Sequence, residues 1–110
     1  MSRVSERRLY WDAPANSGPV TYAVYSGDTG NTNFIAEVDA GNVAPMWEEL
    51  MTTEILLVEG SLPEGNYQFA VCAVDVNENY SDPYQHPAWA NVPLDLTAPN
   101  PPTGGGLDII

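Results

Sequence analysis

The sequence predicts an all-β fold, an antiparallel β-sandwich built from short strands. The first observation is the segment 66–75, in which Tyr67, Phe69, Val71 and Ala73 fall on one face at a period of two residues. The second is the spread of ten prolines and nine glycines along 110 residues, which suits short strands joined by turns. The third is an apolar content of 44%, enough for the single core of one domain.

The expected strands follow one another at the short spacing that is typical of an antiparallel sandwich. Residues 8–12 form the first strand, with Leu9 and Trp11 on one face, and residues 20–26 show the same alternation. Further strands are expected at 33–38, at 55–59, at 66–75 and, interrupted by Pro87 and Pro93, within 84–94. Prolines in the last segment indicate an edge strand, because proline has no N–H to donate to a sheet.

The turn before the long strand has a specific expected geometry. Pro63 presets φ at the turn, and Gly65 can supply a positive φ. Tyr67 follows directly, so its ring can be buried while its hydroxyl bonds back to the backbone, as at the corner of many β-sandwiches.

One segment departs from the β pattern and predicts a short helix near 45–51. Pro45 lies near a helix start, and two acidic residues follow in the first turn. Met46, Trp47, Leu50 and Met51 would then form an apolar stripe at helical spacing. The stripe is either a lid over one open end of the sandwich or an exposed anchor for a partner.

Taken in order, these pieces resemble a fibronectin type III domain of the bacterial and phage style. The matching motifs are Leu9-Tyr10-Trp11-Asp12-Ala13-Pro14, Tyr22-Ala23-Val24-Tyr25, Leu62-Pro63-Glu64-Gly65-Asn66-Tyr67, Ala73-Val74-Asp75 and Asn79-Tyr80-Ser81-Asp82-Pro83. The resemblance implies an immunoglobulin-like sandwich over residues 1–96 and a non-catalytic spacer or binding role. Members of the family serve in secreted enzymes, adhesins and virion surface proteins, so the fold alone fixes none of these roles.

The chain departs from this family at its two ends. It starts almost directly at the family's second strand, and residues 97–103 look like the linker that usually opens such a domain. After that linker come three glycines and then Leu107, Asp108, Ile109 and Ile110. This terminal segment is expected to act as a short strand that completes a neighbouring copy, or to fold back onto its own domain, unless it is a leftover linker. Donation from copy to copy is heterologous and builds rings or filaments.

The outer face of the long strand is expected to be unusually apolar. If Phe69 faces the core, then Ala70, Cys72 and Val74 face outward, and Ala23 and Tyr25 do so on the neighbouring strand. This face is either a docking surface or a modestly exposed face that Thr21 and Gln68 keep soluble.

The formal net charge of −12 excludes some classes of partner. The chain has no lysine and only three arginines, and phosphate contacts need lysine or arginine, so nucleic-acid binding is not expected. No apolar run is long enough for a membrane span, and no signal peptide is recognised at the start. The negative charge either keeps the domain soluble or attracts cations and basic partners.

Candidate chemistry is sparse. Asp75, Asn77 and Asn79 match the opening of a calcium loop, but Tyr80 and His86 stand where that loop needs glycine and glutamate. No cofactor is expected apart from calcium at these residues, and turn formation is their alternative role. No partnered nucleophile or converging pair of carboxylates is recognisable, so the chain is not expected to be an enzyme.

The sequence thus predicts a structural or interaction module. Its expected partners are other copies of itself or assembly proteins, in a virion or an extracellular surface assembly. The alternative is an accessory adhesion or carbohydrate-binding module of a larger secreted protein, with Trp47, Trp89 and Tyr25 as stacking residues. The lone Cys72 allows no disulfide within the chain.

Overall fold

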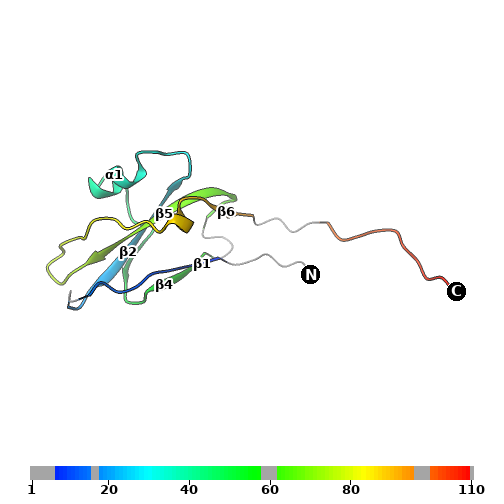
Figure 1. The fold of residues 1–110 in the computed structure, drawn as a ribbon, viewed down its shortest axis with the longest axis horizontal. Coiled ribbons are helices and arrows are strands. Elements are labelled where there is room, and N and C mark those ends of the chain that lie inside the picture. The colour runs from blue at the N-terminus through cyan, green and yellow to red at the C-terminus, as the bar shows by residue number, and fades with distance from the viewer. Residues whose placement is uncertain (1–6, 16–17, 58–61, 96–99, 110) are drawn as a thin grey trace.

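The strands form two antiparallel sheets that pack face to face (Figure 1). The computed structural model describes residues 7–15, 18–57, 62–95 and 100–109. The smaller sheet pairs β1 (Arg7–Tyr10) with β4 (Glu54–Leu57). The larger sheet has the order β3–β2–β5–β6, from β3 (Trp47–Leu50), β2 (Thr21–Asp28), β5 (Gly65–Val74) and β6 (Val92–Leu94). The predicted all-β sandwich architecture is confirmed at this level.

The main core lies between the two sheets. Every strand except the edge strand β3 contributes buried side chains to it, and so does the 3₁₀ helix η1 (Pro87–Trp89). The set is Leu9, Trp11, Tyr22, Val24, Ile55, Leu57, Phe69, Val71, Trp89, Val92 and Leu94. Phe69 and Val71 face this core as the alternation predicts, and Tyr67 and Ala73 pack against it half-buried. The period of two in β5 therefore identifies the inner face correctly.

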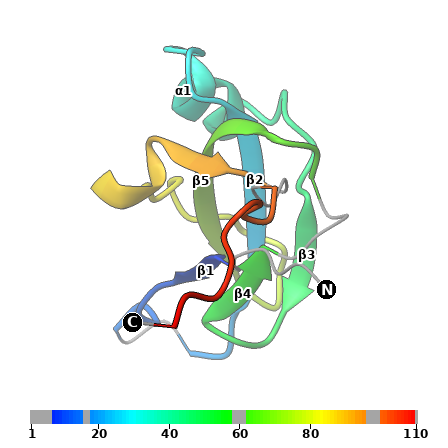
Figure 2. The same ribbon diagram turned by 90° about the vertical axis from the view of Figure 1, so that its right-hand side faces the viewer.

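A short helix, α1 (Phe34–Asp39), adds a third layer on the outer face of the larger sheet (Figure 2). The predicted strand at 33–38 is wrong. Phe34 and Val38 lie one helical turn apart and are both buried against β2 and β5, whereas Ala36, which a strand would place on the same face, is exposed. Gly41 ends the helix with φ of 77°, and its N–H donates to Val38 while that of Asn42 donates to Glu37.

The predicted helix near 45–51 is also wrong, because Trp47–Leu50 forms the edge strand β3. The N–H of Met46 donates to the carbonyl of Val24, and Trp47 pairs with Val24, so β2 satisfies this backbone. Glu49 has a φ of 58°, where the register between β2 and β3 shifts. Part of the predicted stripe still reaches the core, since Met46, Trp47 and Leu50 pack against it, whereas Met51 is exposed.

Strand boundaries otherwise agree with the expected segments to within about two residues. Val58 and Glu59, predicted at the end of the fourth strand, lie outside the described residues. Within 84–94, the regular strand is restricted to Val92–Leu94 at the edge of the larger sheet. Pro93 sits in this edge strand, as its missing N–H requires.

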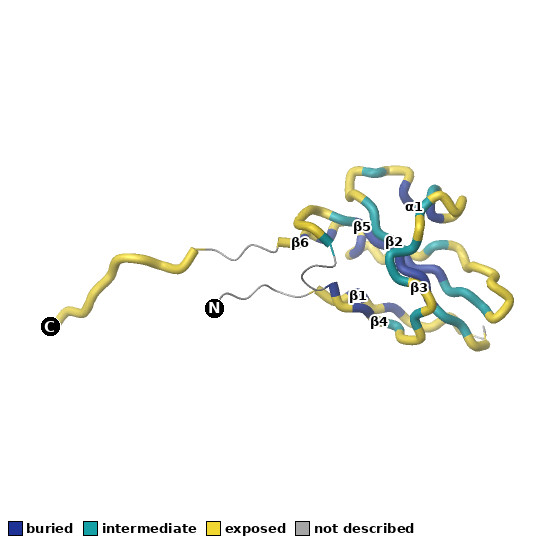
Figure 3. The backbone as a smooth tube through the Cα atoms, turned by 180° about the vertical axis from the view of Figure 1, so that it is seen from behind, coloured by how far each residue is buried: buried dark blue, intermediate teal, exposed yellow. Residues whose placement is uncertain are grey.

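Beyond β6, residues 100–109 are exposed and contain no helix or strand (Figure 3). This tail leads away from the sandwich and gives the molecule its longest dimension of 73 Å, against 28 and 22 Å in the other directions. Fold-back of the tail onto its own domain is therefore not what this structure shows.

Candidate functional site

One edge of β1 pairs with no described strand. β1 pairs with β4 along its whole length, and the N–H of Trp11 continues that ladder by donating to Thr53 over 3.0 Å. In an antiparallel pair, alternate residues direct their N–H and C=O groups to opposite edges. The backbone N–H and C=O groups of Leu9 and Trp11 therefore point to β4. Those of Arg8 and Tyr10 point to the other edge of β1.

A groove runs along this free edge of β1, which we call the β1 groove. It consists of two cavities of about 470 and 220 Å³, and Tyr10 and His86 line both. One wall is β1 with the residues that follow it, and the opposite wall comes from β2, β5 and the segment 81–92. The lining of the larger cavity consists of Tyr10, Trp11, Asp12, Pro14, Tyr22, Val71, Ala73, Ser81, Tyr84 and His86.

The opposite wall is held in place by hydrogen bonds to β5. Tyr84 and Val71 exchange both backbone hydrogen bonds, each 2.9 Å long. The amide of Gln85 donates to the side chain of Gln68 and to the carbonyl of Phe69. His86 accepts a hydrogen bond at Nδ1 from the N–H of Ala88 and so starts η1. The groove is thus built on a sheet rather than on a free loop.

Aromatic rings form the floor of the β1 groove. Trp11 contacts Tyr22 edge to face, with 5.4 Å between ring centroids, and contacts Trp89 at 6.3 Å. Tyr84 and His86 each pack against the same Trp89 ring. Trp11 is only 8% exposed, and its indole Nε1 has no hydrogen-bond partner among the described residues. A buried donor without an acceptor costs free energy, and Trp11 also lines the larger cavity of the groove.

Arg7 and Arg8, the two arginines within the described residues, both line the smaller cavity. Arg8 forms an ion pair of 3.0 Å with Glu54, and its guanidinium carbon lies 5.0 Å from the ring centroid of Tyr10. In a chain with a formal net charge of −12, this end of the groove is where a negative group meets positive charge.

The predicted donor segment lies in the exposed tail. Leu107 is 93% exposed and Ile109 is 99% exposed, so neither side chain is covered by its own domain. Asp108 is exposed as well, and Ile110 lies outside the described residues. Because Leu107 and Ile109 alternate with Asp108, an extended chain would present both apolar side chains on one side.

The predicted open outer face is contradicted by the structure. Ala23, Tyr25, Ala70 and Cys72 are buried, and Val74 packs half-buried against them, because α1 covers this side of the sheet. Gln68 does not keep the face soluble, since its amide is buried and donates to the carbonyls of Asp28 and Asn31. The apolar pattern of the outer face thus serves a contact within the chain.

Burial also changes the acidity of two groups under α1. Desolvation raises the pKa of the Cys72 thiol to about 11, although its hydrogen bond with Tyr25 opposes this shift. Desolvation likewise raises the pKa of Tyr25 to about 12. Both side chains border a cavity of about 400 Å³ beside α1, together with Asp39 and Tyr80. Neither group is ionised near neutral pH.

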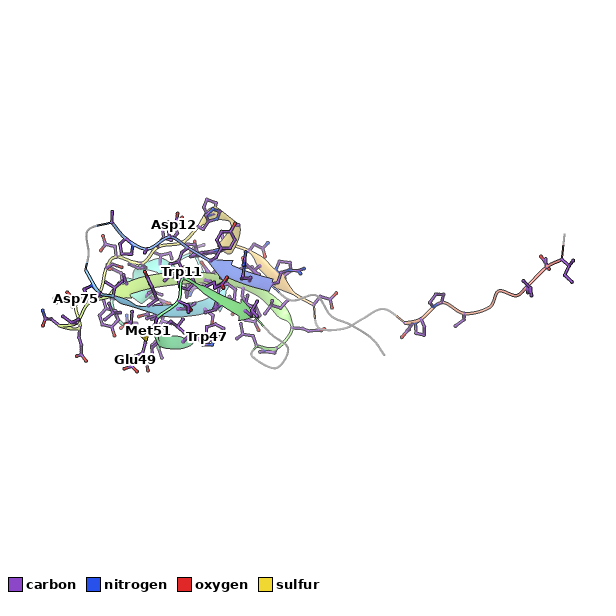
Figure 4. All side chains as sticks on the ribbon, turned by 90° about the horizontal axis from the view of Figure 1, so that it is seen from below. Trp11, Asp12, Trp47, Glu49, Met51 and Asp75 are labelled. Atoms are coloured by element: carbon purple, nitrogen blue, oxygen red, sulfur yellow. The ribbon has the colours of Figure 1, made fainter. Side chains whose placement is uncertain are left out.

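The candidate calcium residues form a loop closed by its own hydrogen bonds. Asp75 Oδ1 accepts from the backbone N–H groups of Asn77 and Asn79, each over 2.9 Å, and Oδ2 accepts from the Asn79 side chain. The Asn79 donors, foremost its backbone N–H, lower the pKa of the Asp75 carboxyl. The loop lies at the end of the sandwich opposite to the tail (Figure 4). Turn closure therefore accounts for these oxygens, and calcium binding stays a prediction.

Two of the predicted sugar-stacking residues are not available for stacking. Tyr25 and Trp89 are each 5% exposed, and Trp47 is half-buried on β3. Among the described residues, no three His, Cys, Asp or Glu side chains gather into a candidate metal site. The most accessible aromatic rings beside the β1 groove are instead Tyr10 and Tyr84.

Sequence reasoning missed the β1 groove, and strand donation by residues 107–110 stays a prediction. Tyr84 and His86 are far from β1 in sequence, and β5 brings them to it. The available signal was the series of aromatic and histidine side chains at 80–89, after the longest strand. None of the described helices has the length and apolar character needed to cross a membrane. Comparisons with family models, curated proteins and solved structures gave no match.

Proposed function

We propose that this protein is a non-catalytic interaction module of the fibronectin type III kind, and that its copies join through the C-terminal segment 107–110. The observation that carries the proposal is that one chain has both a free strand edge and an exposed apolar segment. No described strand pairs with the second edge of β1, and the tail presents Leu107 and Ile109 to solvent. An unpaired sheet edge is a template for an added strand.

The fold supports the type of module. With β1 as the second strand of the family, the smaller sheet contains two strands, and a preceding strand would pair at the free β1 edge. The tyrosine hydroxyl that bonds back across the turn before β5 also agrees with that family. The role we assign is a subunit or decoration of a virion or an extracellular surface assembly.

The proposal is tested by the mass in solution. Light scattering is measured for the full chain and for a chain that ends at Leu96. Oligomers of the full chain and monomers of the shortened chain are expected. A matched pair refines the test, since Leu107→Ser with Ile109→Ser should also yield monomers, whereas Leu107→Val with Ile109→Val should retain the oligomer. A full chain that remains monomeric at millimolar concentration contradicts the proposal.

The second candidate function is an accessory carbohydrate-binding module. Tyr10 and Tyr84 favour it, because their rings border the larger cavity and are 64% and 52% exposed. A glycan array distinguishes the two functions, with Tyr10→Ala and Tyr84→Ala as variants that should abolish any hit. An array without hits removes this candidate and leaves the assembly proposal unaffected.

A further inference from the structure

We infer that the acceptor for the donated segment is the β1 groove, with residues 107–110 of a second copy paired along the free edge of β1. This inference rests on the proposed function and adds the place, the partner and the contacts. The occupant is a second copy of this chain, because the tail of the same chain leads away from the groove.

The other sheet edges are less suited to receive a strand. β3 carries Glu48 and Glu49, and its backbone is irregular at Glu49, both of which protect an edge. β6 has three residues and includes Pro93, which lacks an N–H. β4 contributes no residue to either cavity of the groove. Of the strands that the structure describes, β1 is the one that combines an unpaired edge with this groove.

Side chains of the segment fit the groove in alternation. In an extended strand Leu107 and Ile109 project to one side, and Asp108 projects to the other. Placed on the groove side, the two apolar side chains would cover the ring floor formed by Trp11 and Tyr84. Burying two aliphatic side chains that are almost fully exposed provides the main driving force.

The indole N–H of Trp11 needs a hydrogen-bond acceptor, and an added strand can provide one. This N–H is buried and has no partner among the described residues, and Trp11 lines the larger cavity. A paired strand introduces backbone carbonyl groups into this space, and a carbonyl is the acceptor that an indole N–H needs. The same strand would satisfy the outward N–H and C=O groups of Arg8 and Tyr10.

Charge favours binding of the donated segment at β1 over binding elsewhere on the molecule. Each copy has a formal net charge of −12, so two copies repel each other over most of their surface. Both described arginines lie on β1 beside the groove, and the donated segment carries Asp108. The positive charge of Arg7 and Arg8 therefore favours the approach of the acidic segment to this edge.

The chain is long enough for this contact. Residues 95–106 span up to roughly 40 Å when extended, which carries the segment clear of its own sandwich. The donor segment and the groove are different surfaces of one chain, so the contact is heterologous and continues from copy to copy.

The test is intermolecular paramagnetic broadening on full-length protein. A nitroxide is attached at Gly106→Cys, where an added Cβ meets no atom within 4 Å and φ is not in the left-handed region. Cys72 is buried and stays unlabelled. The nitroxide-bearing chain contains no ¹⁵N and is mixed with ¹⁵N-labelled wild-type chain. Every broadened signal therefore reports a contact between copies.

We expect broadening of the amide signals of residues 7–12, 84–86 and 88. Broadening centred on β3 or β4, with residues 7–12 unaffected, overturns the inference but leaves the assembly proposal standing. Monomeric mass together with no broadening between copies removes both. The two failures are therefore distinguishable.

A second variant examines the indole. Trp11→Phe removes the N–H and keeps an aromatic ring, and we expect the dissociation constant between copies to rise roughly two- to tenfold. Loss of the indole N–H should not by itself lower the melting temperature of the monomer, because this donor has no partner within the described chain. Trp47→Phe on β3 makes the same chemical change outside the groove and should leave the dissociation constant unchanged. An unchanged constant in Trp11→Phe overturns the role of the indole.

Discussion

The hydroxyl of Tyr67 donates a hydrogen bond of 2.7 Å to the carbonyl oxygen of Pro63, four residues earlier in the chain. This bond closes the turn that leads into β5, and the half-buried Tyr67 ring packs beside Phe69 with 6.2 Å between ring centroids. A single side chain thereby fixes both the turn and the first inward position of the longest strand.

Tyr67→Phe should lower the free energy of unfolding by about 1 kcal/mol, because it removes this hydrogen bond and keeps the ring. Urea denaturation measures the change, with an unaltered m value. Tyr10→Phe is the matched control, since the exposed Tyr10 ring retains its contact with Arg8. Equal stability of the two variants would contradict the role of the Tyr67 hydroxyl.

Gly27 is required by the helix that covers the sheet. A Cβ at this position would lie 2.5 Å from Cδ1 of Phe34, the first residue of α1, whose side chain is fully buried. Gly27→Ala should therefore cost about 1–3 kcal/mol through overpacking, as measured by thermal or urea unfolding. Gly30→Ala has open space around the new Cβ and should cost much less. If Phe34→Leu is combined with Gly27→Ala, part of the loss should be recovered.

Cys72 should react slowly with thiol reagents in the native state. Burial raises the pKa of its thiol to about 11 and excludes the reagent. With Ellman's reagent at pH 8, we expect little reaction within minutes for the folded chain and complete reaction in guanidinium chloride. Rapid native labelling would show that α1 opens readily from the sheet.

The same raised pKa makes stability depend on alkaline pH. Because the folded value lies above the ordinary value of 9.0, this contribution is fully present below pH 9 and is lost as pH rises toward about 11. Melting temperatures between pH 8 and 11 should fall more steeply in the wild type than in Cys72→Ala. Parallel curves would contradict the assignment.

Asp75 should contribute to stability only when it is ionised. Hydrogen bonds from Asn79 and Asn77 lower the pKa of its carboxyl from the ordinary value of 3.8. The contribution is therefore present above about pH 4 and is lost as pH falls through the lower folded value. Asp75→Asn keeps an acceptor without titrating, so its melting temperature should lie below that of the wild type above pH 4 and converge with it at lower pH. A constant difference would contradict this.

The sequence predicted the strands best where a period of two coincided with a buried inner face. In β5, Phe69 and Val71 were placed correctly because one face of the strand meets the core and the turn signals mark its start. The two errors, at 33–38 and 45–51, fall on segments of a few residues, where helix and strand patterns are ambiguous. Phe34 and Val38 share one face in a helix and in a strand alike, so the available signal for α1 was Gly41, which ends the helix.

The groove and the covered outer face could not be derived from local pattern. Which residues cover Ala70 and Cys72 depends on where α1 returns to the sheet, and this is set by Gly27 and by the amide of Gln68. Likewise, Tyr84 reaches β1 only through its pairing with Val71. Both relationships depend on tertiary contacts between segments distant in the sequence.

The cover that α1 provides has a consequence for growth of the proposed assembly. It removes the broad face of the larger sheet as a route for lateral stacking, so copies add along one direction only. Such a chain of copies is polar, with an unused tail at one tip and a vacant groove at the other. A short peptide with the sequence of residues 107–110 would then act as a terminator, because it fills the vacant groove without supplying one of its own.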